Sequence, residues 1–279
     1  MKYIIPLFIC IIVGQSCQKN ENEGSPKEPG PPQLAAYTDS MLHAVGLQSY
    51  SDVLTGKLEG NFEIFEYCTP YDVNCSDFTP QTELNGSVSL DTNRTSTIDA
   101  GVLKINQLSI TPNTNKRYEI HFGTSQYNSQ QAQLNLIYGA TNTIKLVKNG
   151  VDVFNKSLYV PKHIKYTGYD CATSKMKNDP IKANDEIYWN SDYSNKNGIL
   201  IRFTGNDSRG IEYTFYRIVS DLGKYAVTES DLSYFPKEKN GMGIQVELNR
   251  GNFFLTYGTD GRRYNVTINA SCKYYFNLF

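Results

Sequence analysis

Apolar and polar residues alternate with a period of two in many short runs of this chain. Tyr118, Ile120 and Phe122, for example, are each separated by one polar residue. Such alternation is typical of a β-strand with one buried and one solvated face. The runs recur at spacings of about 8 to 12 residues, with turn residues between them and almost no helical periodicity. The sequence therefore predicts an all-β protein built of sandwiches or barrels.

Turn residues divide several of these runs into hairpins. Asn149-Gly150 and Asp260-Gly261 accept the positive φ values of a tight turn, so we expect a hairpin at each. One segment is predicted to be helical, because Thr228 and Asp231 have the spacing of a cap before a turn that Pro236 ends. Other strands are predicted at residues 134–138, 187–189, 199–203, 211–215, 243–248, 253–257, 263–268 and 272–279.

Pro161 interrupts the strand pattern, and residues 162–180 have only weak periodicity. We therefore predict two tandem β-sandwich, immunoglobulin-like domains at residues 34–161 and 162–279. The chain is 39% hydrophobic, which is sufficient for two cores. Its net charge of -1 provides no field to attract nucleic acid, which we exclude as a partner.

The first 16 residues have the layout of a secretory signal. Lys2 precedes an apolar run from Ile4 to Val13, which is shorter than the roughly 20 residues that span a bilayer, and small residues lead into Cys17. With Cys17, the segment resembles a bacterial lipoprotein signal, which implies cleavage after residue 16 and a lipid on Cys17. Residues 17–33 would then be the lipidated cysteine and a disordered tether rich in Asn, Glu, Gly, Ser and Pro.

Two other stretches resemble those of known lipoproteins. Residues 18–23 are similar to the charged segment behind the lipid cysteine of Bacteroidota lipoproteins that are exported to the cell surface. Residues 185–190 and 232–252 resemble β-sandwich domains of cell-surface lipoproteins from the same bacteria. These resemblances imply a protein that is lipid-anchored in the outer membrane and faces the cell exterior rather than the periplasm. They identify no functional family.

Four of the six cysteines lie beyond the signal and the lipid site. An even number of cysteines in an oxidising compartment indicates disulfides, and four cysteines allow three pairings. The spacing lacks the Cys-x-x-Cys pairs of a zinc site, so we expect no metal. The pairing we favour is Cys68 with Cys75 and Cys171 with Cys272.

The sequence contains no recognisable catalytic motif. His43, His121 and His163 lie in no metal-binding run, and there is no nucleophile elbow or phosphate-binding loop. A glycosidase needs only two carboxyl groups that face each other across a groove. The two residues can be any number of positions apart in the sequence, so no motif would reveal them. We predict that the protein is not an enzyme and has no cofactor. The carboxylates nearest the aromatic cluster of the second half, expected to be solvated strand ends, are Glu186, Asp192 and Glu212.

One interpretation of the 21 tyrosines and the single tryptophan is a glycan platform, because flat aromatic faces pack on sugars while nearby amides and carboxylates form hydrogen bonds with the sugar hydroxyls. Trp189 shares a strand face with Ile187 and is expected in the core rather than on a platform. Tyr188 and Tyr193 are therefore the better candidates. The full set of candidate ligand-binding residues is Tyr188, Trp189, Asp192 and Tyr193.

The leading functional prediction is a membrane-anchored, non-enzymatic binding or accessory module for a glycan or an outer-membrane protein. One alternative is a fimbrial subunit that assembles by strand exchange, with residues 272–279 as the donor strand. The other alternative is a carbohydrate hydrolase.

Overall fold

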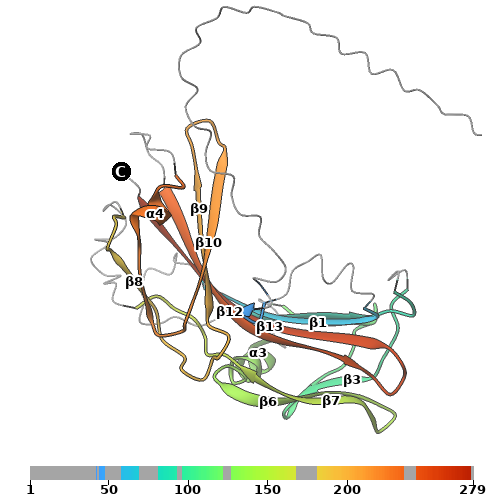
Figure 1. Cartoon of the computed structure of the whole chain (residues 1–279). Coiled ribbons are helices and arrows are strands. Elements are labelled where there is room, and N and C mark those ends of the chain that lie inside the picture. Colours follow the sequence, from blue (N-terminus) through green and yellow to red (C-terminus); the bar gives the residue numbers. More distant parts are fainter. Residues whose placement is uncertain are drawn as a thin grey trace, which may run out of the picture. The chain divides into compact units, whose positions relative to one another are not determined.

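The computed structural model describes residues 42, 44–47, 58–68, 81–92, 96–121, 127–167, 181–235 and 243–277. Residues Leu34–Phe279 form one compact unit, and the described part of it is mostly β-structure (Figure 1). The predicted signal peptide, the lipid site at Cys17 and the tether lie outside the described residues.

The largest element is a seven-stranded sheet (Figure 1). Neighbouring strands in this sheet are antiparallel, except that the first strand of the chain runs parallel to the last. In spatial order its strands are β10 (Glu212–Val219), β9 (Ile199–Asn206), β12 (Gly243–Tyr257), β13 (Arg263–Asn277), β1 (Gly60–Cys68), β2 (Gln81–Val88) and β5 (Arg117–Ile120).

Smaller elements cover one face of this sheet. A four-stranded sheet has the order β4 (Leu108–Ile110), β3 (Val102–Ile105), β6 (Ala140–Lys148) and β7 (Val151–Val160). A two-stranded sheet consists of β11 (Lys224–Ala226) and β8 (Glu186–Tyr188). Two short helices are α3 (Tyr127–Asn135) and α4 (Glu229–Leu232).

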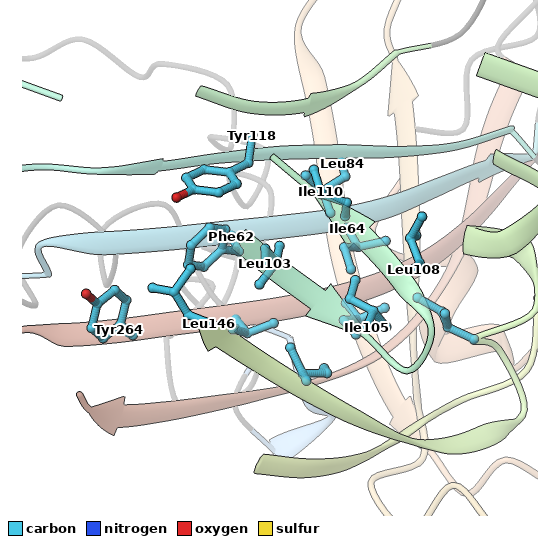
Figure 2. Packing of buried hydrophobic residues seen from close by; sticks show 14 of the residues in the cluster. Phe62, Ile64, Leu84, Leu103, Ile105, Leu108, Ile110, Tyr118, Leu146 and Tyr264 are labelled. Carbon is cyan, nitrogen blue, oxygen red and sulfur yellow. The ribbon is translucent and has the colours of Figure 1, made fainter. Parts of the chain in front are cut away.

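The first core lies between the seven-stranded and four-stranded sheets (Figure 2). Phe62 of β1 and Tyr118 of β5 pack edge to face, with their ring centroids 5.2 Å apart. Burial of such large rings supplies much of the stabilising energy of a sandwich. Other members of the first core are Ile64, Leu84, Leu103, Ile105, Leu108, Ile110, Leu146 and Tyr264.

The second core is built mainly from residues after Pro161. Phe203 of β9 stacks on Phe215 of β10 at 4.5 Å, and Trp189 lies in the same cluster. The last strand belongs to both cores. Its residues Tyr264, Val266 and Ile268 pack in the first core, whereas Ala270, Cys272 and Phe276 pack in the second.

The predicted boundary at Pro161 divides most residues of the two cores, apart from those of β13, but it does not divide the large sheet. Strands β1, β2 and β5 precede residue 161, whereas β9, β10, β12 and β13 follow it, and all seven are hydrogen-bonded in one sheet. The physical link is the pairing of β1 with β13, which is continuous from Gly60 to Cys68. The two halves of the chain are therefore joined by strand pairing.

Predictions of local turns are confirmed. Asn149 and Gly150 have φ values of 52° and 80° and connect β6 to β7. Gly261 has a φ of 77° in the turn between β12 and β13. The cap of α4 is also confirmed, because the Thr228 hydroxyl accepts from the Asp231 amide and the Asp231 carboxylate accepts from the Thr228 amide.

Two predictions about elements are wrong. Residues 134–138 do not form a strand, because they are the last turn of α3 and the turn after it. Leu134 and Ile137 are buried there while Leu136 is exposed, which is a helical spacing rather than an alternation. The four strands predicted between residues 243 and 279 are in fact two strands of 15 residues each, β12 and β13.

Candidate functional site

Polar side chains cover one face of β1, β2 and β5. Alternate residues of these strands, such as Phe62, Ile64 and Leu84, point into the first core, so the intervening residues point to the opposite, outer face of the sheet. The strand register aligns these outward residues in two rows. One row is Asn61, Ser87 and Arg117, and the other is Glu63, Asn85 and Glu119.

The two rows line a cavity of about 290 Å³, which we call the polar cavity. Its volume is close to the lower end of the roughly 300–1,000 Å³ of small-molecule sites. Its walls offer amides, carboxylates, a hydroxyl and a guanidinium, which together donate and accept hydrogen bonds. The lining residues are Asn61, Glu63, Asn85, Gly86, Ser87, Arg117 and Glu119.

A chain of side-chain hydrogen bonds fixes one wall of the polar cavity. The buried Asn265 of β13 donates from Nδ2 to Asn61 Oδ1 at 2.7 Å and to Thr267 Oγ1 at 2.9 Å. Asn61 in turn donates from Nδ2 to Glu63 Oε1 at 2.7 Å. Because each amide is held by the next, the Glu63 carboxylate is oriented before any ligand arrives.

The opposite wall is held by the turn before β5. Asn113 donates from Nδ2 to Glu119 Oε2 at 2.8 Å, and its Oδ1 accepts from the Arg117 amide at 3.0 Å. Arg117 Nη1 lies 3.4 Å from Glu119 Oε1. His121 lies beyond Glu119, with Nε2 at 3.7 Å from its carboxylate. The guanidinium of this wall is therefore already paired with a carboxylate.

Asn85 occupies the centre of the polar cavity, between Glu63 and Glu119 in the strand register. Within the described residues, its side-chain amide makes no hydrogen bond to protein, although it is only half-exposed. An amide without a protein partner at this half-exposed position can exchange its contacts with solvent for hydrogen bonds to a ligand. The sequence alone did not predict strands here, because Phe65 and the buried Glu66 break the alternation that Phe62 and Ile64 begin, and residues 81–88 contain only two apolar residues, Leu84 and Val88.

Another part of the outer face is covered. Leu42, Val45 and Leu47 pack against Leu200 and Tyr216, which lie on β9 and β10. A Cβ on Gly46 would meet the carbonyl oxygen of Gly251 at 2.2 Å, so this segment lies directly against β12. The polar cavity lies at the other end of the strand order, over β1, β2 and β5.

Two of the predicted ligand-binding residues are buried. Trp189 is 2% exposed and donates from Nε1 to Asp221 at 2.8 Å. Asp192 is 0% exposed and accepts from the Tyr159 hydroxyl, the Lys162 amide and the Ser194 amide. Burial opposes ionisation of Asp192, but these hydrogen bonds outweigh it and lower its pKa. Both side chains are thus occupied inside the protein.

The other two predicted residues are more exposed. Tyr188 is 36% exposed, and its hydroxyl bonds the Glu186 carboxylate, which also accepts from Lys224 Nζ at 2.8 Å. Tyr193 is 68% exposed. The structure therefore separates the predicted set of four into two buried and two accessible residues, and none of them lines the polar cavity.

His163 and Glu66 form a pair near the meeting point of the two cores. His163 Nδ1 lies 2.7 Å from Glu66 Oε2, and Nε2 lies 3.0 Å from the carbonyl oxygen of Asn135. A carbonyl only accepts, so Nε2 is the donor in its contact with Asn135, and Nδ1 faces the carboxyl group. Burial raises the pKa of Glu66 despite the nearby His163 and Arg250. Since both ring nitrogens are occupied, His163 is not placed to act as a base on a ligand.

The other predicted histidines and carboxylates provide no further site. His43 lies outside the described residues, and His121 is exposed. Glu212 lies at the surface near Arg202. In the described part of the chain, no group of three or more His, Cys, Asp or Glu side chains is arranged to hold a metal ion.

Cys272 is disulfide-bonded. Cys75 and Cys171 lie outside the described residues, and only the backbone of Cys68 is described. The strand register places Cys68 directly opposite Cys272 on the neighbouring parallel strand. Adjacent strands are about 4.8 Å apart, within the Cα separation that a disulfide requires, so Cys68 competes with Cys171 as the partner of Cys272. The predicted pairing stays a prediction.

Comparison of the chain with protein-family models, curated proteins and solved structures finds no match. Among the residues that the structure describes, no helix is long and apolar enough to cross a bilayer.

Proposed function

We propose that this protein is a non-enzymatic binding module whose polar cavity holds a carbohydrate. The observation that carries the proposal is the unpaired Asn85 amide between the carboxylates of Glu63 and Glu119. Sugar hydroxyls both donate and accept hydrogen bonds, and this row offers both partners side by side. The fixed orientation of Glu63 supports the proposal, because a preorganised site loses less entropy on binding.

The cellular setting is also a proposal and rests on the sequence. A lipid on Cys17 and a tether up to residue 33 would hold the module at the outer membrane, facing the cell exterior. The partner would then be a glycan, or an outer-membrane protein that the module assists. Replacing Cys17 with Ala should move the protein from the membrane fraction to the soluble fraction. The immunoglobulin-like character of each half stays a prediction.

A glycan array with the soluble chain from Gln33 onward tests the proposed function. We expect retention of at least one saccharide, and Asn85→Ala should weaken it by roughly tenfold, since one direct hydrogen bond contributes about 0.5–1.5 kcal/mol and a charge-assisted one more. Asn155→Ala is the matched control, because Asn155 is an exposed amide on β7 of the other sheet. Equal binding by the Asn85 and Asn155 variants would exclude the polar cavity as the site.

A hydrolase is the second candidate, because Glu63 and Glu119 line one cavity. They lie two strands apart, or about 9.6 Å between backbones at a strand spacing of about 4.8 Å. Inverting glycosidases hold their carboxyl groups about 6.5–9.5 Å apart. Incubation of the protein with any oligosaccharide that the array retains distinguishes a hydrolase from a binding module. A hydrolase would generate new reducing ends, and a binding module would not.

The fimbrial alternative receives less support. Strand β13 contains most of the proposed donor segment and pairs with β12 on one side and β1 on the other within the same chain. Strand exchange would require that one of these pairings be broken first.

A further inference from the structure

Resting on the proposed carbohydrate function, we infer that the polar cavity selects uncharged saccharides and rejects acidic ones. Two carboxylates and one guanidinium line the cavity, which leaves an excess of negative charge. The guanidinium of Arg117 lies beside Glu119, where it offsets that carboxylate rather than a ligand's. An acidic sugar would therefore meet the Glu63 carboxylate, whose charge no neighbouring cation among the described residues offsets.

The surroundings of Glu63 sharpen this selection. Within the described residues, its only polar side-chain contact is the neutral Asn61 amide, which donates to Oε1. A carboxylate has about four acceptor sites, so Glu63 keeps capacity for hydroxyl donors from a ligand. Two neighbouring hydroxyls of a neutral sugar match these acceptors, and a hydrogen bond to a charged acceptor is roughly twice as strong as a neutral one.

The neighbouring row adds further negative charge. Glu83 lies on the same outer face of β2, two residues before Asn85. His121 lies between the two carboxylates, 3.8 Å from Glu83 and 3.7 Å from Glu119. This histidine thus faces two protein carboxylates. Like charges a few ångströms apart repel appreciably even near a surface.

A matched pair of polysaccharides tests the inference. Oligogalacturonate carries a carboxylate on each residue, whereas its fully methyl-esterified form has the same backbone without charge. We would measure binding of the chain from Gln33 onward to both, and to neutral glucose, mannose and galactose oligomers, by calorimetry at low salt. We expect the uncharged ligands to bind at least tenfold more tightly than the acidic one.

Variants at the two walls separate charge selection from shape. Glu63→Gln keeps the shape and removes the charge, so we expect it to reduce the preference for uncharged ligands by about tenfold. Arg117→Gln should increase the preference, because it frees the Glu119 carboxylate from its cation. Circular dichroism and thermal unfolding would show whether each variant retains the native fold, and Glu119→Gln replaces Glu63→Gln if the latter does not.

The same measurements distinguish failure of the carbohydrate function from failure of the charge selection. If every uncharged and acidic saccharide is left unbound, the carbohydrate function itself is overturned. If saccharides bind but the acidic form binds as tightly as its ester, the carbohydrate function stands and the charge selection is overturned. An unchanged preference in folded Glu63→Gln would also overturn it.

Discussion

At Gly86, the structures on both faces of the large sheet limit which side chain the position can hold. Its outer side lines the polar cavity, while a Cβ on its inner side would lie 2.5 Å from Cδ1 of Phe62. The Phe62 ring is fully buried and held against Tyr118, so it cannot move without disturbing the first core (Figure 2). Because position 86 has no side chain, the Phe62 ring can pack against β2 on one face while the polar cavity lies on the other face.

We predict that Gly86→Ala lowers the free energy of unfolding by about 1–3 kcal/mol, the usual cost of overpacking a core. Gly243→Ala is the matched control, because it is also a strand glycine but its Cβ would meet nothing closer than 3.5 Å. Urea unfolding of both variants measures the difference. Equal stability of the two variants would show that the Phe62 ring adapts to the added methyl group.

The Glu66–His163 pair predicts a dependence of stability on pH. The folded-state pKa of Glu66 is raised above 4.5, mainly by burial, so the fold favours its protonated form. Its contribution is therefore most favourable below pH 4.5 and is lost as the pH rises toward the folded-state pKa. Glu66→Gln is uncharged and can still donate to His163 Nδ1, so it should remove this loss.

Urea unfolding at pH 4.5 and pH 6 would measure the effect of Glu66→Gln. We expect the variant to gain stability relative to wild type as the pH rises. Glu186→Gln serves as the control with the opposite sign and is measured also at pH 3, because hydrogen bonds from Lys224 and Tyr188 lower the pKa of Glu186, so its contribution is lost as the pH falls below 4.5. Parallel pH profiles for wild type and Glu66→Gln would contradict the prediction.

At the scale of elements, local signals predicted turns and many strands, but not their extent or pairing. The turns at Asn149-Gly150 and Asp260-Gly261 depend on two residues each, so they could be recognised directly. Strand β12 was divided in two because Arg250, a charged residue on a core-facing position, interrupts the apolar alternation. The pairing of β1 with β13 joins residues 204 positions apart, and local periodicity holds no information on such a partner.

The candidate site was hidden for the same reason. Glu119 lies in a run that we predicted as a strand, but Glu63 and Asn85 lie in runs where buried Glu66 and the glycine at 86 weaken the apolar pattern. Only the register of three strands brings these side chains together. The segment 188–193 was easier to notice because its aromatic residues are adjacent in sequence, although two of the four candidates are core or loop-bracing residues.

The buried charge on β12 gives a prediction at this scale. Arg250 and Asp221 are 2.8 Å apart with side-chain exposures of 0% and 1%. Arg250 also donates to the carbonyl oxygens of Lys162, His163 and Asn190, and so ties the segment after Pro161 to the large sheet. Removing one partner leaves the other charge buried and unpaired.

We therefore expect Arg250→Met to lower the free energy of unfolding by roughly 3–5 kcal/mol, the usual cost of breaking a buried pair. The double variant Arg250→Met with Asp221→Asn should recover part of this loss, because no unpaired charge remains. Lys224→Met is the control, because its ion pair with Glu186 is exposed and should change stability little. Denaturant unfolding would measure all three, and a double variant no better than the single one would show that the lost carbonyl contacts dominate.

At the scale of the whole molecule, the chain has two cores but one continuous sheet. Apart from β13, the residues of the first core precede Pro161 and those of the second core follow it, and the periodicity of the sequence also changes there. The large sheet is continuous across that boundary, because β13 lies between β1 of the first half and β12 of the second half. Strand β13 also supplies apolar residues to both cores. Tyr138 also packs against both clusters, and its hydroxyl bonds the carbonyl oxygen of Asn269 at 3.1 Å. Neither half therefore has a complete set of strands.

This arrangement predicts that the two halves cannot fold separately. A fragment of residues 34–161 lacks β13, so β1 would lose nine paired residues and the first core would lose Tyr264, Val266 and Ile268. A fragment of residues 162–279 would expose those same apolar side chains to water. We expect each fragment alone to lack a cooperative thermal transition by circular dichroism, and the chain 34–279 to unfold in one transition. Co-expression of the fragments should restore the transition, because strand pairing needs no peptide bond at Pro161. Cooperative unfolding of either fragment alone would instead establish the independent domains that the sequence predicts.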